Sequence, residues 1–303
     1  MVEGRRLPAS AAQHFRADTG VTRLAPTKRR SQGLVGCGLL TVFLYAVGAL
    51  IVAPFVWMAL TAVKPTPEIL AIPFKWFPSR VTFEHLRYIF QFAPFHLYLL
   101  NSFIIASAST TSDVIVAAVV GYGFAKFRFY GSRVLFVVLL TGLMIPFSVR
   151  LLPLFRMIVA LGLTDTYAGV ILPNMASILG IFLLRQYLTS FPTEIQESGR
   201  LDGASEPRIF LSLVFANTKP MLAAVGIFKF VFYWNDFLWP LVVISSPARR
   251  TITVGMAMYI GKQYLEYGPF MAAAMVSIVP ILAVSVALQR YIIKGVILTG
   301  LKG

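Results

Sequence analysis

Long apolar stretches separated by shorter polar ones dominate the pattern of this 303-residue chain. Six of the apolar stretches supply the roughly 20 residues that an α-helix needs to cross the ~30 Å hydrocarbon core of a bilayer. The predicted spans cover residues 33–60, 97–125, 134–155, 168–188, 221–244 and 270–288. The pattern therefore predicts an all-α, polytopic membrane protein with six transmembrane helices.

Prolines inside the predicted spans indicate that these helices pack against one another. The four positions are Pro54, Pro146, Pro173 and Pro280. A proline removes a backbone hydrogen bond, and a membrane helix tolerates this loss only where neighbours or water satisfy the freed carbonyl. We therefore expect a bundle of packed helices around a path or cavity.

Composition and charge agree with a membrane protein. Hydrophobic residues make up 57% of the chain and charged residues 13%, against about 25% charged in an ordinary soluble domain. The net charge is +15, but Lys and Arg lie mostly between the apolar stretches, so we expect no nucleic-acid partner. Seventeen of them fall on the side of the two termini and nine on the other side. The positive-inside rule then predicts that both termini are cytoplasmic.

The amino-terminal end is expected to be a tail rather than a folded domain. Residues 1–32 are basic and are predicted to be a disordered cytoplasmic tail, and residues 33–303 to form one transmembrane domain. The first apolar stretch is too long for a signal peptide, although an Arg-rich transit peptide remains an alternative. The chain has one cysteine, Cys37, which excludes an internal disulfide.

A polar segment, residues about 189–220, separates the fourth and fifth predicted spans. Thr193 and Gln196 have the spacing of a capping box, in which each side chain satisfies a free amide. Asp202-Gly203 is a strong turn dipeptide, and Ser205 is suited to begin the next helix. The segment is therefore predicted to form two short helices joined by a sharp turn, placed in the cytoplasm.

Two interpretations of this segment are open. A plain connector between antiparallel spans needs only about 2–8 residues, yet this one is much longer. A short amphipathic helix in a partner's groove is a common recognition mode. We favour docking, because small and apolar side chains would permit a close approach. These are Ile195, Ser198, Gly199, Leu201, Gly203 and Ala204.

Ionisable residues at membrane depth are the next candidates for function, because they are costly there and tend to face a bundle interior. Lys229 and Asp236 are seven residues apart, which predicts one helix face, and Asp113 lies in the second span. They could line a transport path. Alternatively, Asp236 is hydrated at the end of its span and Lys229 snorkels or pairs.

Nothing in the chain predicts catalysis. His14, His85 and His96 lack metal-ligand spacing, and no Gly-rich phosphate loop is followed by Lys and Ser or Thr. We therefore expect no enzyme activity, no metal and no cofactor bound by this chain. An integral membrane enzyme would need a cluster of polar residues at one depth, which the sequence does not provide.

Several stretches resemble one family of transporters. The segment Glu197 to Ala204, ESGRLDGA, resembles the cytoplasmic "EAA" loop of bacterial ABC importer permeases. Together with YWNDFLWP at 233–240, FAKFRF at 124–129 and LGLTDT at 161–166, it is similar to the maltose-type carbohydrate permeases. The likeness extends over nearly the whole chain. It implies an ABC type I importer permease fold in the bacterial inner membrane and ATP-driven import of a carbohydrate or polyol derivative.

The resemblance also implies partners and site residues. The loop would be the coupling helix that docks on a separate ATPase, with Glu197 as a polar contact, Asp202-Gly203 as the turn and Ala204 as a close-packed position. Its docking and coupling residues would be Glu197, Ser198, Gly199, Leu201, Asp202, Gly203 and Ala204. The usual alanine pair is replaced by Ser198-Gly199, and the usual Leu-Pro by Phe215-Ala216.

The implied complex contains a second homologous permease, two ATPase subunits that use ATP and Mg, and an extracytoplasmic binding protein contacting residues 64–95. Candidate residues of the substrate path are Asn101, Asn174, Tyr233, Asn235 and Asp236. Tyr233, Trp234 and Trp239 suit sugar stacking, but an interfacial aromatic belt uses the same residue types. The alternative function is a secondary transporter driven by an ion gradient, which predicts paired carboxylates in the spans and internal repeats.

Overall fold

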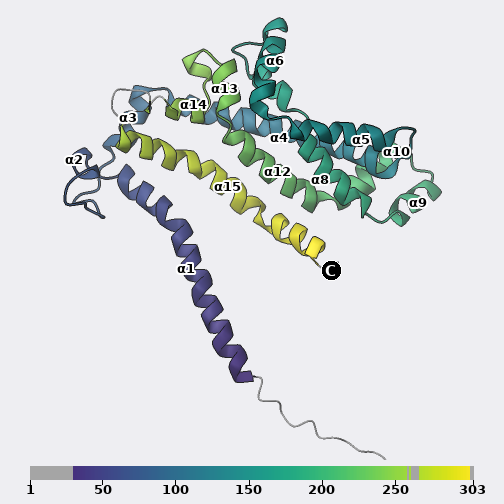
Figure 1. The fold of residues 1–303 in the computed structure, drawn as a ribbon, viewed down its shortest axis with the longest axis horizontal. Coiled ribbons are helices and arrows are strands. Elements are labelled where there is room, and N and C mark those ends of the chain that lie inside the picture. The colour runs from purple at the N-terminus through teal and green to yellow at the C-terminus, as the bar shows by residue number, and fades with distance from the viewer. Residues whose placement is uncertain (1–29, 258, 261–265, 301–303) are drawn as a thin grey trace, which may run out of the picture. The chain divides into compact units, whose positions relative to one another are not determined.

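The computed structural model describes residues 30–257, 259–260 and 266–300, and this part of the chain contains helices and turns but no strand (Figure 1). The helices up to the polar segment are α1 Arg30–Ala62, α2 Thr66–Ile69, α3 Glu84–Phe92, α4 Phe95–Lys126, α5 Ser132–Thr141, η2 Gly142–Met144, α6 Phe147–Ala160, α7 Tyr167–Ile171, η3 Leu172–Asn174 and α8 Ile178–Thr189. Those that follow are α9 Glu194–Leu201, α10 Glu206–Arg208, η4 Ile209–Val214, α11 Phe215–Asn217, α12 Lys219–Trp234, α13 Leu238–Val243, η5 Pro247–Arg249, α14 Ile252–Ala257 and α15 Tyr267–Gly300.

The chain divides into two compact units, residues 1–54 and 55–303. Most of the predicted basic tail, residues 1–29, lies outside the described residues, so the predicted boundary after residue 32 stays a prediction. The boundary falls inside α1, so the second unit holds the end of α1, the later helices and every contact discussed below.

Four helical segments of the described chain are each long and apolar enough to cross a membrane, one of them made of α7, η3 and α8. They are Gly38–Ala62, Phe95–Lys126, Tyr167–Thr189 and Tyr267–Gln289. Two bent helix pairs bring the number of spans to six if each pair counts as one. The prediction of an all-helical, multi-pass protein is confirmed.

The third predicted span, 134–155, is not a straight helix. It falls on α5, η2 and α6, and the two arms meet at 101°. The α-helix tightens into a 3₁₀ turn at Gly142–Met144 and stops before Pro146, the residue that precedes α6. Proline cannot donate the backbone hydrogen bond that would continue the first arm. The bend therefore falls at Pro146, one of the four prolines noted inside the predicted spans.

The fifth predicted span, 221–244, is also wrong as one continuous helix. Helix α12 ends at Trp234, and α13 begins only at Leu238. The bent pair in this region lies earlier, where residues 206–217 meet α12 at 75°. The apolar character of the chain continues across both breaks, which is why hydropathy did not reveal them.

Helix α4 is the centre of the second unit, because α8 and α12 both pack along it, and α15 packs on α12 (Figure 1). Ala117 and Ala118 of α4 are buried against Ile181 and Leu184 of α8. Small side chains on one helix and branched ones on the other allow the backbones to approach closely. This packing holds the two ends of the polar segment, which leaves α8 and returns into α12.

Candidate functional site

Helix α9 ends in a tight turn built by Gly203, as the Asp-Gly dipeptide predicted. Gly203 has φ +77°, and its amide donates to Arg200 O at 3.0 Å. The amide of Ala204 donates to Gly199 O at 2.9 Å. These two bonds form a Schellman motif, in which a left-handed residue closes the helix. The polar segment is therefore two helices joined by a sharp turn, as expected.

The predicted capping box is wrong. Thr193 has helical dihedral angles, φ −76° and ψ −25°, and makes no side-chain capping bond. Its carbonyl accepts from the amides of Gln196 and Glu197 instead, so the backbone itself closes the first turn. Ser205 does occupy the cap position of α10, in an extended conformation, but its side chain makes no capping bond either.

The back of α9 is packed against η4, a π-helical turn. A Cβ atom added at Gly199 would lie 2.9 Å from Leu213 Cδ1 and 3.1 Å from Ile209 Cγ1. Gly199 is therefore a position of close approach to this chain's own η4, and the space is not open to a partner. Ala204 is half-buried in the same cluster, which fits a close-packed position.

The other edge of α9 and its turn are exposed. Leu201 is the most notable side chain there, with 89% of its surface exposed. Glu197, Ser198, Asp202 and Gly203 are exposed beside it. An apolar side chain surrounded by small and acidic neighbours, on a helix fixed from behind, is a suitable docking edge.

An ion pair that the sequence did not predict joins α9 to α10. Arg200 Nε donates to Glu206 Oε1 at 2.6 Å, and both side chains are partly exposed. The hydrogen bond and the charge of Glu206 raise the pKa of the Arg200 guanidinium. Because the two residues flank the Gly203 turn, their contact fixes the angle between the two helices.

Three helices meet at a buried cluster around Asp113. Lys229 Nζ of α12 lies 3.2 Å from Asp113 Oδ2 of α4, and both side chains are buried. Tyr233 donates its hydroxyl to the same carboxylate oxygen at 2.8 Å. Asp113 Oδ1 accepts from the amide of Ser177, at the start of α8, at 2.8 Å. Lys229 is therefore paired, with a residue 116 positions earlier in the sequence, and its role in a transport path stays a prediction.

Asp236 does not share a helix face with Lys229, because α12 ends at Trp234. Asp236 Oδ1 accepts from the amide of Trp239 at 3.4 Å, near the start of α13, and its carbonyl accepts from Thr253 at 2.8 Å. Asn235 is exposed and donates to Val231 O at 2.8 Å. These two candidate path residues therefore lie in the turn between two helices.

The remaining candidates of the substrate path are held in structural hydrogen bonds. Asn101 is buried, donates to the carbonyls of Ala248 and Arg250, and accepts from the Tyr167 hydroxyl at 2.7 Å. Asn174 is half-buried, and its backbone carbonyl oxygen lies 3.0 Å from the Tyr233 hydroxyl, whose one proton it shares with Asp113. Tyr233, Trp234 and Trp239 are all buried. Their role in a path stays a prediction.

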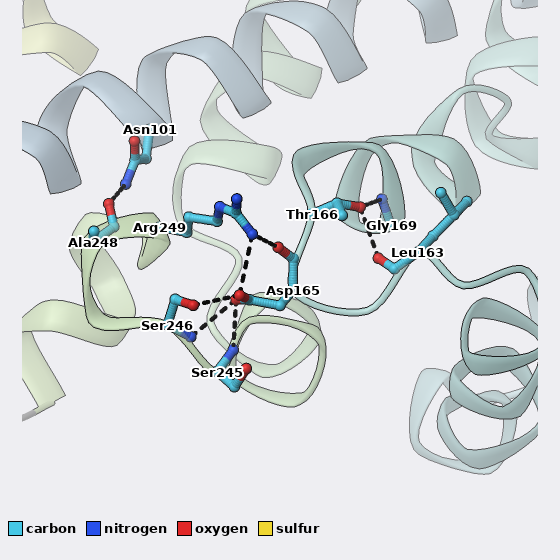
Figure 2. A network of polar contacts seen from close by, with 9 residues as sticks. All are labelled: Asn101, Leu163, Asp165, Thr166, Gly169, Ser245, Ser246, Ala248 and Arg249. Carbon is cyan, nitrogen blue, oxygen red and sulfur yellow. Dashed lines mark hydrogen bonds and ion pairs between the residues drawn. The ribbon is translucent and has the colours of Figure 1, made fainter.

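Asp165 forms a second polar centre, in the loop between α6 and α7 (Figure 2). Its carboxylate accepts from the amides of Ser245 and Ser246 at 3.1 and 2.9 Å and from the Ser246 hydroxyl. Arg249 reaches the same carboxylate at 3.1 Å. The bonds from Ser246, then Ser245 and the charge of Arg249, hold the pKa of Asp165 below its ordinary value. The carboxylate thereby ties this loop to the one between α13 and α14.

Comparison with known proteins identifies the family and the fold of this chain. Residues 114–298 match the family described as "Binding-protein-dependent transport system inner membrane component". The chain is 30% identical over 267 residues to the arabinooligosaccharides transport system permease protein AraQ of Bacillus subtilis (strain 168), covering 87% of this chain and 95% of that protein. It is 33% identical to the sn-glycerol-3-phosphate transport system permease protein UgpE of Pectobacterium atrosepticum, over 76% of this chain and 85% of that one.

A solved structure has the same fold. It is the crystal structure of a bacterial ABC transporter involved in the import of the acidic polysaccharide alginate, and one of its chains aligns with a TM-score of 0.76. The alignment covers 88% of this chain and 100% of that chain at 19% identity. With the family match spanning more than half of its length, the chain belongs to the inner-membrane components of binding-protein-dependent transport systems, the permease subunits of ABC importers.

Proposed function

We propose that this permease subunit translocates a carbohydrate or polyol derivative. The relatives described above are named for the transport of arabinooligosaccharides and of sn-glycerol-3-phosphate, a carbohydrate and a polyol derivative. The pattern of six helical segments, two of them bent, supports a bundle that encloses a path.

We further propose that the exposed edge of α9 docks on a separate ATPase, which binds ATP and Mg and hydrolyses the nucleotide for the complex. The observation that carries this proposal is the 89% exposure of Leu201 on a helix whose opposite face is packed at Gly199. An exposed leucine on a rigid support costs little conformational entropy when a partner covers it. The chain itself hydrolyses no ATP on this proposal.

The complete importer would contain a second homologous permease, two ATPase subunits and an extracytoplasmic binding protein. Both termini would lie in the cytoplasm, as the distribution of Lys and Arg supports. The α9 turn would then face the ATPase, and the Asp165 loop would face the opposite side of the membrane.

The docking edge is tested by Leu201→Asp. Because Leu201 is exposed and contacts little of its own chain, the variant should insert and fold normally but should lose copurification of the ATPase. Leu161→Asp is the matched control, since Leu161 is also exposed (56%) but lies in the loop after α6. If Leu201→Asp retains the ATPase at the yield of Leu161→Asp, α9 is not the docking site.

The transport mechanism is tested with the assembled complex in liposomes. Uptake of a radiolabelled sugar should require ATP inside the liposomes and should persist when ionophores collapse the ion gradients. Uptake without ATP that stops on ionophore addition would instead identify a secondary transporter, for which the buried Asp113 and Lys229 pair would be the natural ion-coupled site.

A further inference from the structure

The loop between α1 and α3 begins and ends at the tip of a membrane span. Helix α1 has its last residue at Ala62 and its membrane-spanning part ends there. The amide of Thr82 donates to Val63 O at 2.9 Å, which closes the neck of the loop directly beside that end. Whatever the loop contacts must therefore lie near the membrane surface.

Contacts inside the loop fold it back on its neck. Lys64 is buried, donates its Nζ to Lys75 O, and lies 5.0 Å from the centre of the Phe74 ring. The Glu68 carboxylate accepts from the amide and hydroxyl of Ser79, the former at 2.9 Å, and pairs with Lys75 at 3.5 Å. These bonds hold the pKa of Glu68 below its ordinary value. The tip of the loop is thus tied to residues beside α1.

Large apolar side chains cover the free surface of this loop. Ile72 is almost fully exposed, at 98%, and Phe77 and Trp76 are exposed at 74% and 67%. Four more apolar side chains of the loop are exposed, namely Leu70, Phe74, Val81 and Phe83. An apolar patch of this extent on a folded loop marks a surface that something apolar covers.

The charges of the loop favour lipid as the covering. The two acidic residues at the ends of the loop are engaged inside the protein, Glu68 with Ser79 and Lys75 and Glu84 with Thr66. Within residues 69–83 the charged residues are Lys75 and Arg80, both basic and both exposed. Tryptophan and phenylalanine beside Lys and Arg are the side chains that occupy the headgroup region of a bilayer, where cations contact phosphate groups. The extracytoplasmic binding protein expected at residues 64–95 is the alternative covering, and the experiment below distinguishes it from lipid.

We propose that residues 70–83 form an interfacial anchor, with the Ile72, Trp76 and Phe77 side chains in the bilayer interface and Lys75 and Arg80 at the phosphates. The anchor would fix the depth of the end of α1 in the membrane. This inference needs only the membrane location of the chain and is independent of the cargo and of ATPase docking.

Trp76 provides the test, in the assembled transporter in nanodiscs of phosphatidylcholine and phosphatidylglycerol. The fluorescence emission of Trp76 is obtained by subtracting the emission of the Trp76→Phe variant from that of the unmodified protein. We expect lipids brominated near the carboxyl end of their acyl chains to remove most of this emission, and lipids brominated near the methyl end to remove little. Trp239→Phe is the matched control, because Trp239 is 1% exposed and its emission should survive both lipids.

Two results would overturn the proposal. One is a Trp76 emission that brominated lipids leave unchanged while aqueous acrylamide quenches it. The other is a Trp76 emission that becomes protected only when a binding protein is added, which would make the loop a protein-docking surface. If Trp76→Phe does not fold, a nitroxide attached at Phe77→Cys, after replacement of Cys37 by Ser, distinguishes a lipid from an aqueous environment of the loop. Greater access to oxygen than to a water-soluble nickel complex supports the anchor, and the reverse rejects it.

Discussion

Replacement of Lys229 by methionine tests whether the buried ion pair holds the helix bundle together. Lys229 Nζ lies 3.2 Å from Asp113 Oδ2, and the two side chains are 9% and 0% exposed. Removing one partner of a buried pair leaves an uncompensated charge and costs about 3–5 kcal/mol. After Lys229→Met, Asp113 keeps its bonds from Ser177 and Tyr233. We therefore expect Lys229→Met to lower the free energy of unfolding by about 3 kcal/mol, the lower end of that range.

Asp113→Leu should cost more, at the upper end of the range. It leaves the Lys229 ammonium buried beside the rings of Phe232 and Tyr233, at 5.7 and 5.8 Å, without its carboxylate partner, and it leaves the Ser177 amide without its acceptor. The double variant, Lys229→Met with Asp113→Leu, removes both charges. It leaves the Ser177 amide without an acceptor, which costs about 1–3 kcal/mol. The double variant should thus be more stable than Asp113→Leu alone.

Equilibrium unfolding in mixed micelles, followed by circular dichroism, measures the free energies of this double-mutant cycle. Phe228→Met on the same helix is the control, because Phe228 is 72% exposed and should cost less than about 1 kcal/mol. If the cost of the double variant equals the sum of the single costs within about 0.5 kcal/mol, the two side chains do not interact, and the ion pair does not help to hold α12 on α4.

Two other predictions follow from contacts at the loops. Gly199→Leu should overpack α9 against Leu213 and cost about 1–3 kcal/mol, measured by thermal unfolding, whereas Gly199→Ala should cost less because the Leu213 methyl group can move. The contacts of Asp165 with Ser245, Ser246 and Arg249 should break in acid. The pKa of Asp165 in the folded protein lies below the unfolded value of about 3.9. Its contribution to stability is therefore present above that value and is lost as the pH falls through the folded pKa. A nitroxide at Ala248→Cys should gain mobility only below about pH 4, and Asp165→Asn should remove this pH dependence; a transition near neutral pH would contradict the assignment.

The polar segment was largely predictable because its signals are local. Asp202-Gly203 demanded a left-handed residue after a helix, and Gly203 adopts one. The capping box failed for a physical reason: Thr193 continues the helical backbone, so its carbonyl does what its side chain was expected to do. The role of Gly199 could not be foreseen, since it depends on side chains ten or more residues away in η4.

The membrane helices show where hydropathy loses information. A window of apolar residues has the same mean hydropathy whether the backbone is straight or bent, so the breaks at Pro146 and after Trp234 stayed hidden. Pro146 was a usable signal, because a proline inside a helix marks a lost backbone bond. The break after Trp234 had weaker warning in Asn235-Asp236.

Pairing across the bundle was beyond the sequence. Asp113 and Lys229 were each recognisable as costly residues, yet which helix faces which depends on packing between segments far apart in the chain. Asn101 illustrates the same limit, because its carbonyl partners lie at Ala248 and Arg250.

The π-helical turn η4, Ile209–Val214, has a consequence for how the chain is aligned with its relatives. A π turn holds one more residue per hydrogen-bonded ring than an α turn, so it behaves as a one-residue insertion absorbed without a loop. Deleting one residue there would restore an ordinary helix and rotate α9 by about 100° about the helix axis. Leu201 would then point in another direction while every side chain in the segment remained chemically unchanged. The extra residue of the π turn therefore sets the direction in which α9 presents Leu201. A single-residue gap at this point in an alignment should be read as a rotation of α9.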